Sequence, residues 1–170
     1  MTVLMECLAH EDSLTQAITA VDEYGWSALH IAASNGSIEC VKTLSCAVTH
    51  NISVTTKETA DKWYSNALKS PLISVQTKKG QTALMLAASK GWIDIVVFLM
   101  DQMHAKTNLL DANGQTALER AMLAGKAQVV DFMLGKLESK NARLKAIQAA
   151  SCEGEEYDSS VQAILRKWEL

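Results

Sequence analysis

One twelve-residue pattern occurs three times in the chain, and it restricts the fold more than any other feature. It reads GWSALHIAASNG from Gly25, GQTALMLAASKG from Gly80 and GQTALERAMLAG from Gly114. The first two copies start 55 residues apart, and the last two start 34 residues apart. Self-similarity at such spacings is the sequence signature of a chain built from stacked structural units.

The recurrence also decides how one suggestive pair of residues is interpreted. Ser27 and His30 of the first copy have the residue types of a nucleophile and its base. The histidine position holds Met85 in the second copy and Glu119 in the third. Since a catalytic histidine would not alternate with methionine and glutamate in equivalent units, the pattern favours a repeated turn and helix over a catalytic pair.

The start of each copy has the residues of a tight turn. The glycine supplies a backbone conformation that other residues adopt only at a cost. Asp22 and Asp111, three residues before two of these glycines, are expected to accept hydrogen bonds from the backbone two residues on. Thr77 replaces the acid in the middle copy and is expected to do this less well.

A short helix is predicted to follow each turn. Its N-caps are hydroxyl residues, whose oxygen can accept an unpaired backbone amide: Ser27, Thr82 and Thr116. In the third copy Thr116 and Glu119 also form a TxxE capping box, which explains Glu119 without an acid catalyst. Each helix ends about nine residues after its cap, where a glycine suits a left-handed residue: Gly36, Gly91 and Gly125.

Two helices per copy each have an apolar side. On the first helix this side has i, i+3, i+4 spacing and small alanines that let neighbouring helices approach closely: Leu29, Ala32 and Ala33; Leu84, Ala87 and Ala88; Leu118, Ala121 and Met122. A second helix is expected to bury a similar set: Ile38, Val41 and Leu44; Ile93, Val96 and Leu99; Ala127, Val130 and Met133. Cys40 aligns with Ile95 and Val129, so we expect it in the core as a small hydrophobic residue.

A turn, a short helix and an antiparallel second helix at a period near 33 resemble the ankyrin repeat. The resemblance covers residues 22–46 and 76–137 closely, in the form DxxGxTALxxAAxxG. The sequence departs from the family where the capping residue is usually followed by proline, because alanine stands there in all three copies: Ala28, Ala83 and Ala117. The family's histidine is present only as His30, and residues 105–108 match its connector loosely. The resemblance implies an all-α solenoid of stacked helix-turn-helix units with hairpin-like tips.

The remaining segments are predicted to complete one domain, residues 1–170. Residues 1–21 are interpreted as an abbreviated N-terminal capping repeat, 22–46, 76–110 and 111–137 as repeats, and 138–170 as a C-terminal helical cap. The cap would contain helices over residues 141–150 and 159–168, with Asp158 or Ser159 as the second N-cap. Residues 47–75 contain about 21 surplus residues. A helix over residues 56–68 would use Trp63 and Tyr64 as an anchor on the array or as a partner contact.

Composition and charge exclude several classes of protein. With 170 residues and 48% hydrophobic side chains, the chain can bury a core without metal or disulfides. The four cysteines form no CxxC pair and no histidine lies at ligand spacing from them, so neither a metal nor a cofactor is expected. The net charge is −3, with −6 over residues 1–41 and +4 over residues 42–110. This is no nucleic-acid footprint, and without a basic leader or a long apolar stretch we expect a cytoplasmic chain that is not inserted in a membrane.

The function that the resemblance implies is protein binding through the concave face of the array. Carried over residue by residue, the binding residues are Glu23, Tyr24, Trp26, Asn35, Lys78, Lys79, Gln81, Lys90, Asn113, Gln115 and Leu123. Aromatic and basic residues of this kind tend to carry interface energy, and Trp26 is the one most expected to do so, unless it packs on the neighbouring turn. We predict a monomeric, non-enzymatic scaffold or adaptor. Alternatives are an inhibitor of a partner enzyme such as a kinase, a self-associating structural protein and, with least support, an enzyme.

Overall fold

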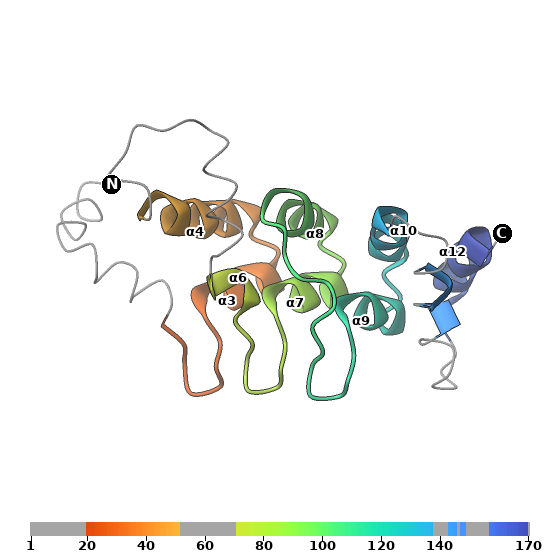
Figure 1. Cartoon of the computed structure of the whole chain (residues 1–170), viewed down its shortest axis with the longest axis horizontal. Helices are drawn as coiled ribbons and strands as arrows, with labels where there is room; N and C mark the ends of the chain where they lie inside the picture. Colours follow the sequence, from red (N-terminus) through yellow and green to blue (C-terminus); the bar gives the residue numbers. More distant parts are fainter. Residues whose placement is uncertain (1–19, 52–70, 138–142, 146, 149–156, 170) are drawn as a thin grey trace.

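The computed structural model describes residues 20–51, 71–137, 143–145, 147–148 and 157–169. Its named helices, in chain order, are α3 Ala28–Asn35, α4 Ile38–Asn51, α6 Pro71–Ser74, α7 Ala83–Lys90, α8 Ile93–Val97, the π-helix η2 Phe98–Gln102, α9 Ala117–Leu123, α10 Ala127–Lys136 and α12 Ser159–Glu169. Figure 1 shows two layers: α3, α7 and α9 form an inner row, and α4, α8, α10 and α12 form an outer row. The predicted all-α solenoid is therefore confirmed.

Three tight loops extend from the inner row on the side away from the outer row (Figure 1). We call them finger 1 (residues 22–26), finger 2 (residues 77–81) and finger 3 (residues 111–115). Each finger, the inner helix after it and the next outer helix make one unit of the array. The part of the chain that the structure describes contains no named strand, only an isolated antiparallel bridge between Val21 and Ser27.

The inner helices begin at the predicted caps. Thr82 and Thr116 accept the amide protons of Met85 and Glu119 at 3.2 and 3.3 Å, as N-caps do. In return, the side chain three residues after each cap accepts the amide N–H of the cap residue. The three acceptors are His30 Nδ1 at 3.1 Å, Met85 Sδ at 3.4 Å and Glu119 Oε2 at 2.6 Å. Three chemically different side chains thus perform the same structural task in the three units.

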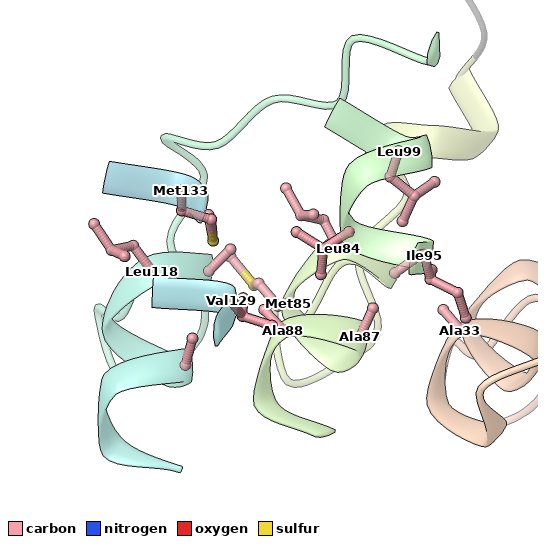
Figure 2. Packing of buried hydrophobic residues seen from close by; sticks show 14 of the residues in the cluster. Ala33, Leu84, Met85, Ala87, Ala88, Ile95, Leu99, Leu118, Val129 and Met133 are labelled. Atoms are coloured by element: carbon pink, nitrogen blue, oxygen red, sulfur yellow. The ribbon is translucent and has the colours of Figure 1, made fainter. Parts of the chain in front are cut away.

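The core lies between the two rows of helices and between neighbouring units. Helix α7 packs against α3 on one side and α9 on the other. In Figure 2, Leu84 and Met85 of α7 point into the space between Leu99 of η2 and Leu118 of α9. The predicted inner-helix sets are all buried, and Ala33, Ala87, Ala88 and Ala121 have no exposed surface. Small side chains at these positions allow the close approach that stacking requires.

A second series of contacts joins the units where each inner helix ends. The Trp92 ring lies where a Cβ on Gly36 would stand, and its Nε1 donates to the Ser34 carbonyl at 3.1 Å. The Lys126 side chain covers Gly91 in the same way, and the Asp158 side chain covers Gly125. These three covering residues directly precede α8, α10 and α12. Helix α12 therefore stands where the outer helix of a fourth unit would stand.

The C-terminal helix is fixed to α10 by polar and apolar contacts. Asp131 accepts from Lys167 Nζ at 2.9 Å and from Trp168 Nε1 at 2.7 Å, and the Arg143 guanidinium lies 4.6 Å from the Trp168 ring centre. These bonds from Lys167 and Trp168 hold the pKa of Asp131 below its usual value. The helix predicted over residues 159–168 is present as α12, and Val161 and Leu165 on its apolar side are buried.

The expectation for Cys40 was wrong. Cys40 is exposed, whereas the equivalent residues Ile95 and Val129 are only 1% exposed. Within the described part of the chain, α8 and α10 each have a preceding unit beside them, whereas α4 borders an open groove. That groove of about 540 Å³ is lined by Ile31, Cys40 and Leu44 among others.

Other expectations fall outside the described residues or changed in detail. The interpretations of residues 1–19, of a helix over residues 56–68 and of Trp63 and Tyr64 lie outside the described residues. Pro71 begins the short helix α6. The second outer helix changes from α to π geometry at Phe98, which the sequence analysis did not predict. The residue boundaries of the units stay a prediction.

Candidate protein-interaction surface

The fingers are closed by a small set of hydrogen bonds that the turn residues dictate. In each finger the first residue donates its amide to the carbonyl four residues on, at 2.9–3.0 Å, and its own carbonyl accepts from the glycine amide, at 2.8–3.0 Å. Asp22 Oδ1 also accepts from the Tyr24 and Trp26 amides, at 2.9 and 2.8 Å. Asp111 repeats this pattern, whereas Thr77 Oγ1 accepts only from Gln81, at 3.2 Å. The predicted difference between aspartate and threonine is confirmed.

Neighbouring fingers are joined to one another through their backbones. The Lys78 amide donates to the Tyr24 carbonyl at 2.9 Å, and the Ala112 amide donates to the Lys79 carbonyl at 2.9 Å. A Cβ on Gly80 would stand 2.9 Å from backbone atoms of finger 3, and one on Gly25 would stand 2.9 Å from the Lys78 nitrogen. The finger tips are therefore held in a row by main-chain contacts, which leaves their side chains free to project.

An ion pair between finger 3 and the inner helix α9 stabilises this finger. Arg120 of α9 donates to Asp111 Oδ2 at 2.6 Å, and the Asp111 side chain is only 1% exposed. With its amide oxygen turned toward Arg120, Gln81 of finger 2 accepts from the same guanidinium at 3.1 and 3.2 Å. Burial acts to raise the pKa of Asp111, but the amides of Gln115 and Asn113 and the guanidinium outweigh it and hold the pKa below its usual value.

The structure places seven of the eleven predicted binding residues on the exposed surface and the other four partly inside. The exposed ones are Glu23, Tyr24, Asn35, Lys78, Lys79, Lys90 and Asn113. Tyr24 is 63% exposed. The half-buried ones are Trp26, Gln81, Gln115 and Leu123.

The half-buried residues have contacts within the array. The Trp26 ring centre lies 6.3 Å from that of His30, tilted by 58°, so Trp26 packs at the base of finger 1. Gln81 is engaged with Arg120. Tyr24, which projects from the tip of finger 1, is therefore better placed than Trp26 for contact with a partner.

The lysines of unit 2 differ from those on the outer helices. Lys42, Lys136 and Lys167 each form an ion pair with a carboxylate, at 2.7–3.2 Å. Among the residues that the structure describes, Lys78 and Lys79 have no ion pair. Lys90 also has none, and it stands at the C-terminal end of the eight-residue helix α7, about 12 Å along the helix axis from its start. Two lysines without an ion pair thus lie together on finger 2, and a third, Lys90, lies at the far end of α7, the inner helix that follows this finger.

The sequence analysis did not single out three exposed apolar residues near this surface. Val21 and Leu110, directly before fingers 1 and 3, are 51% and 54% exposed, and Ile31 of α3 is 49% exposed. Trp92 is 43% exposed, although one side of its ring packs on Gly36. Leu110 occupies the position of Val21 and Gln76 in the other units, and the polarity of Gln76 there could have indicated an exposed site.

The Ser27 and His30 pair has hydrogen-bond geometry but no access for a substrate. Ser27 Oγ lies 2.7 Å from His30 Nδ1, yet both residues are 0% exposed. His30 Nε2 lies 3.1 Å from the carbonyl oxygens of Val75 and Gln81. Burial lowers the pKa of His30, although hydrogen bonds to the Gln81 and Val75 carbonyls act in the opposite direction. The neutral imidazole therefore connects finger 2 to α3.

No group of three or more His, Cys, Asp or Glu side chains arranged to hold a metal ion occurs within the described ranges. None of the described helices is long and apolar enough to cross a membrane. What the geometry provides is a row of rigid backbone turns with projecting tyrosine and lysine side chains. Such a surface suits contact with another macromolecule.

The helix-turn-helix units, the finger row and the stacked cores define a repeat solenoid. A family model described as ankyrin repeats in three copies matches residues 61–156, and one described as ankyrin repeats in many copies matches residues 1–44. The chain belongs to the ankyrin-repeat family. This fold is generally a non-catalytic scaffold for protein interactions.

One solved structure similar to this chain is that of the yeast ribosomal protein Rps3 in complex with its chaperone Yar1. A chain of that complex matches with a TM-score of 0.63 and 26% sequence identity. The match covers 81% of this chain and 85% of the other. A search of curated proteins finds no match to this sequence.

Proposed function

We propose that this chain is a non-enzymatic ankyrin module that holds a partner protein against its finger tips and the ends of its inner helices. The observation that carries the proposal is the combination of rigid backbones and free side chains on fingers 1 and 2. Tyr24, Lys78 and Lys79 project from turns whose backbones are hydrogen-bonded to each other. A partner that contacts these side chains loses little entropy in ordering the loops that carry them.

The lysines indicate the charge of the partner surface. Because Lys78 and Lys79 lack carboxylate partners within the described part of the chain, an acidic surface would gain attraction there without breaking an ion pair. Tyr24 supplies a broad contact with a polar tip, a residue type enriched among interface hot spots. The similarity to a chain from a complex between a ribosomal protein and its chaperone supports partner binding as the role of this fold.

Inhibition of a partner enzyme remains within this proposal as a consequence of binding, because a partner held on the fingers has part of its surface covered. A monomeric state is also proposed, and sedimentation at several concentrations separates it from self-association.

The test is affinity measurement on the partner retained from the native lysate. Tyr24→Ala should weaken binding by about thirtyfold or more if Tyr24 is a hot spot. Lys78→Glu combined with Lys79→Glu should weaken it further, with a loss that shrinks at high salt. Lys106→Glu, at an exposed lysine outside the fingers, is the matched control. Equal binding by all variants would refute the proposed surface.

A further inference from the structure

The row of fingers has an open end at finger 3. Each earlier finger gives its neighbour one carbonyl, from the residue before the finger's glycine: Tyr24 for Lys78, and Lys79 for Ala112. The equivalent carbonyl of finger 3 belongs to Asn113. It accepts no hydrogen bond from the residues that the structure describes, and a Cβ on Gly114 would have nothing within 4 Å. The acceptor of the finger-to-finger hydrogen bond is thus present at this edge, and the donor from a next finger is not among the described residues.

The side chain at the same edge is apolar. Gln76, directly before finger 2, donates from Nε2 to the carbonyl of Leu110, directly before finger 3, at 2.9 Å. Leu110 occupies the equivalent position one unit later and is 54% exposed. The edge therefore combines an exposed leucine, an unpaired backbone acceptor and a bare glycine. We call it the finger 3 edge, formed by Leu110, Asn113 and Gly114.

The fold leaves room at this edge for a loop or strand but not for another repeat. Helix α12 already stands in the outer place of a fourth unit, against α10. Helix α10 ends at Lys136, and residues 143–145 are helical. The sequence between them, residues 137–142, is much shorter than residues 103–116, which carry finger 3. A second copy of this chain cannot stack its own first unit here, because the helix layer behind the edge is occupied.

We propose that the finger 3 edge receives an extended segment of the partner protein. One backbone N–H of this segment donates to the Asn113 carbonyl, as Lys78 and Ala112 do in the earlier fingers, and a neighbouring apolar side chain packs on Leu110. This is strand addition to a free edge, in which main-chain hydrogen bonds give affinity and side-chain contacts give selectivity. The inference rests on the proposed function and deepens it, since it names the kind of partner segment and where it binds.

Gly114→Asn is the variant that tests the edge. Asparagine tolerates a positive φ better than most residues with a side chain, and Gly114 has φ 76° with open space around it, so the variant should fold. Its side chain would occupy the space that a docked backbone needs, because Gly25 and Gly80 have backbone atoms 2.9 Å from their Cβ positions. Leu110→Ser is a second variant, at an exposed position. Circular dichroism and the melting temperature verify the fold of both.

The probe is a phage-displayed library of random twelve-residue peptides selected on the wild-type chain. Some selected peptides should bind Gly114→Asn at least about tenfold more weakly, since a hydrogen bond and its adjoining contact are lost together. In these peptides, N-methylation of one backbone amide should abolish binding to the wild-type chain, while methylation of the next amide should not. A library without any such peptide overturns the inference, as do peptides that tolerate methylation at every amide.

The intact partner separates this inference from the proposed function. If Tyr24→Ala and the lysine reversals weaken partner binding while Gly114→Asn and Leu110→Ser do not, the finger surface stands and the edge is wrong. If Gly114→Asn also weakens binding by about tenfold, the edge is part of the interface. If none of the variants changes binding, the proposed function and the edge both fail.

Discussion

Two glycines in the same backbone conformation but with different neighbours allow the contact between fingers to be measured. Gly80 and Gly114 have φ values of 71° and 76°. Alanine at either position incurs the strain of the left-handed region, roughly 1–2 kcal/mol. It also restricts the unfolded chain by the same amount at both positions. These two effects cancel when the variants are compared with each other.

What remains is the packing of the added methyl group. At Gly80 it would stand 2.9 Å from Asp111 Cα and from the Ala112 nitrogen, which are backbone atoms that cannot rotate away. Overpacking of this kind costs roughly 1–3 kcal/mol. At Gly114 the methyl group meets nothing within 4 Å. Gly80→Ala should therefore be less stable than Gly114→Ala by roughly 1–3 kcal/mol.

The assay is urea unfolding followed by far-UV circular dichroism, with thermal unfolding as a second measurement. For a chain of this length the difference corresponds to roughly 2–12 °C in melting temperature, at about 2–4 °C per kcal/mol. Equal destabilisation of the two variants would show that the fingers do not support each other. It would also remove the basis for treating Gly114 as an open version of the same contact.

Three further predictions concern the core and the buried titratable groups. Leu84→Ala should destabilise the chain by about 2–5 kcal/mol in urea unfolding, because Leu84 is 1% exposed. Ile31→Ala, at a site that is 49% exposed, should destabilise it far less. Similar destabilisation by the two variants would contradict the packing described. Since burial lowers the pKa of His30, stability should fall as the pH decreases below 6.5, where the unfolded chain takes up the proton first. His30→Met places the residue of the second copy, Met85, in the first, and should remove this fall in stability below pH 6.5 in urea unfolding. If the variant keeps the same pH dependence, a group other than His30 causes it. Because the pKa of Asp111 is lowered on folding, its carboxylate stabilises the folded chain above pH 3.8, and this stability is lost as the pH falls through the folded-state pKa. The stability of Asp111→Asn should therefore lack this part of the decrease in acid. Stability curves of wild type and variant that fall equally at acidic pH would contradict the prediction.

Sequence reasoning succeeded where the cause of the structure lies within a few residues. The aspartates in fingers 1 and 3, the threonine caps Thr82 and Thr116 and the apolar spacing of the inner helices act through neighbours along the chain. They were predicted correctly for that reason. The inference that His30 is structural was also correct, although the reason became visible only in the folded chain. His30, Met85 and Glu119 all accept the amide proton of the cap residue.

It failed where the neighbour comes from another unit. Cys40 was expected in the core because it aligns with Ile95, but burial of that position requires a unit packed on its outer side. For Trp26 the sequence left open a contact role or packing within the array, and the ring lies half-buried beside His30 of its own unit, while Tyr24 projects from the finger tip. The binding role of all the predicted residues stays a prediction.

The sequence by itself determined that units recur, where each turn and helix begins and which helix faces are apolar, since hydrogen bonding and side-chain spacing along one segment specify these features. Only the tertiary structure decided what each equivalent position contacts. Gly25, Gly80 and Gly114 are the same residue in the same turn, but two are covered by the next finger and one is open. Stacking gives identical residues different surroundings according to their place in the row, and those surroundings decide which of them are available to a partner.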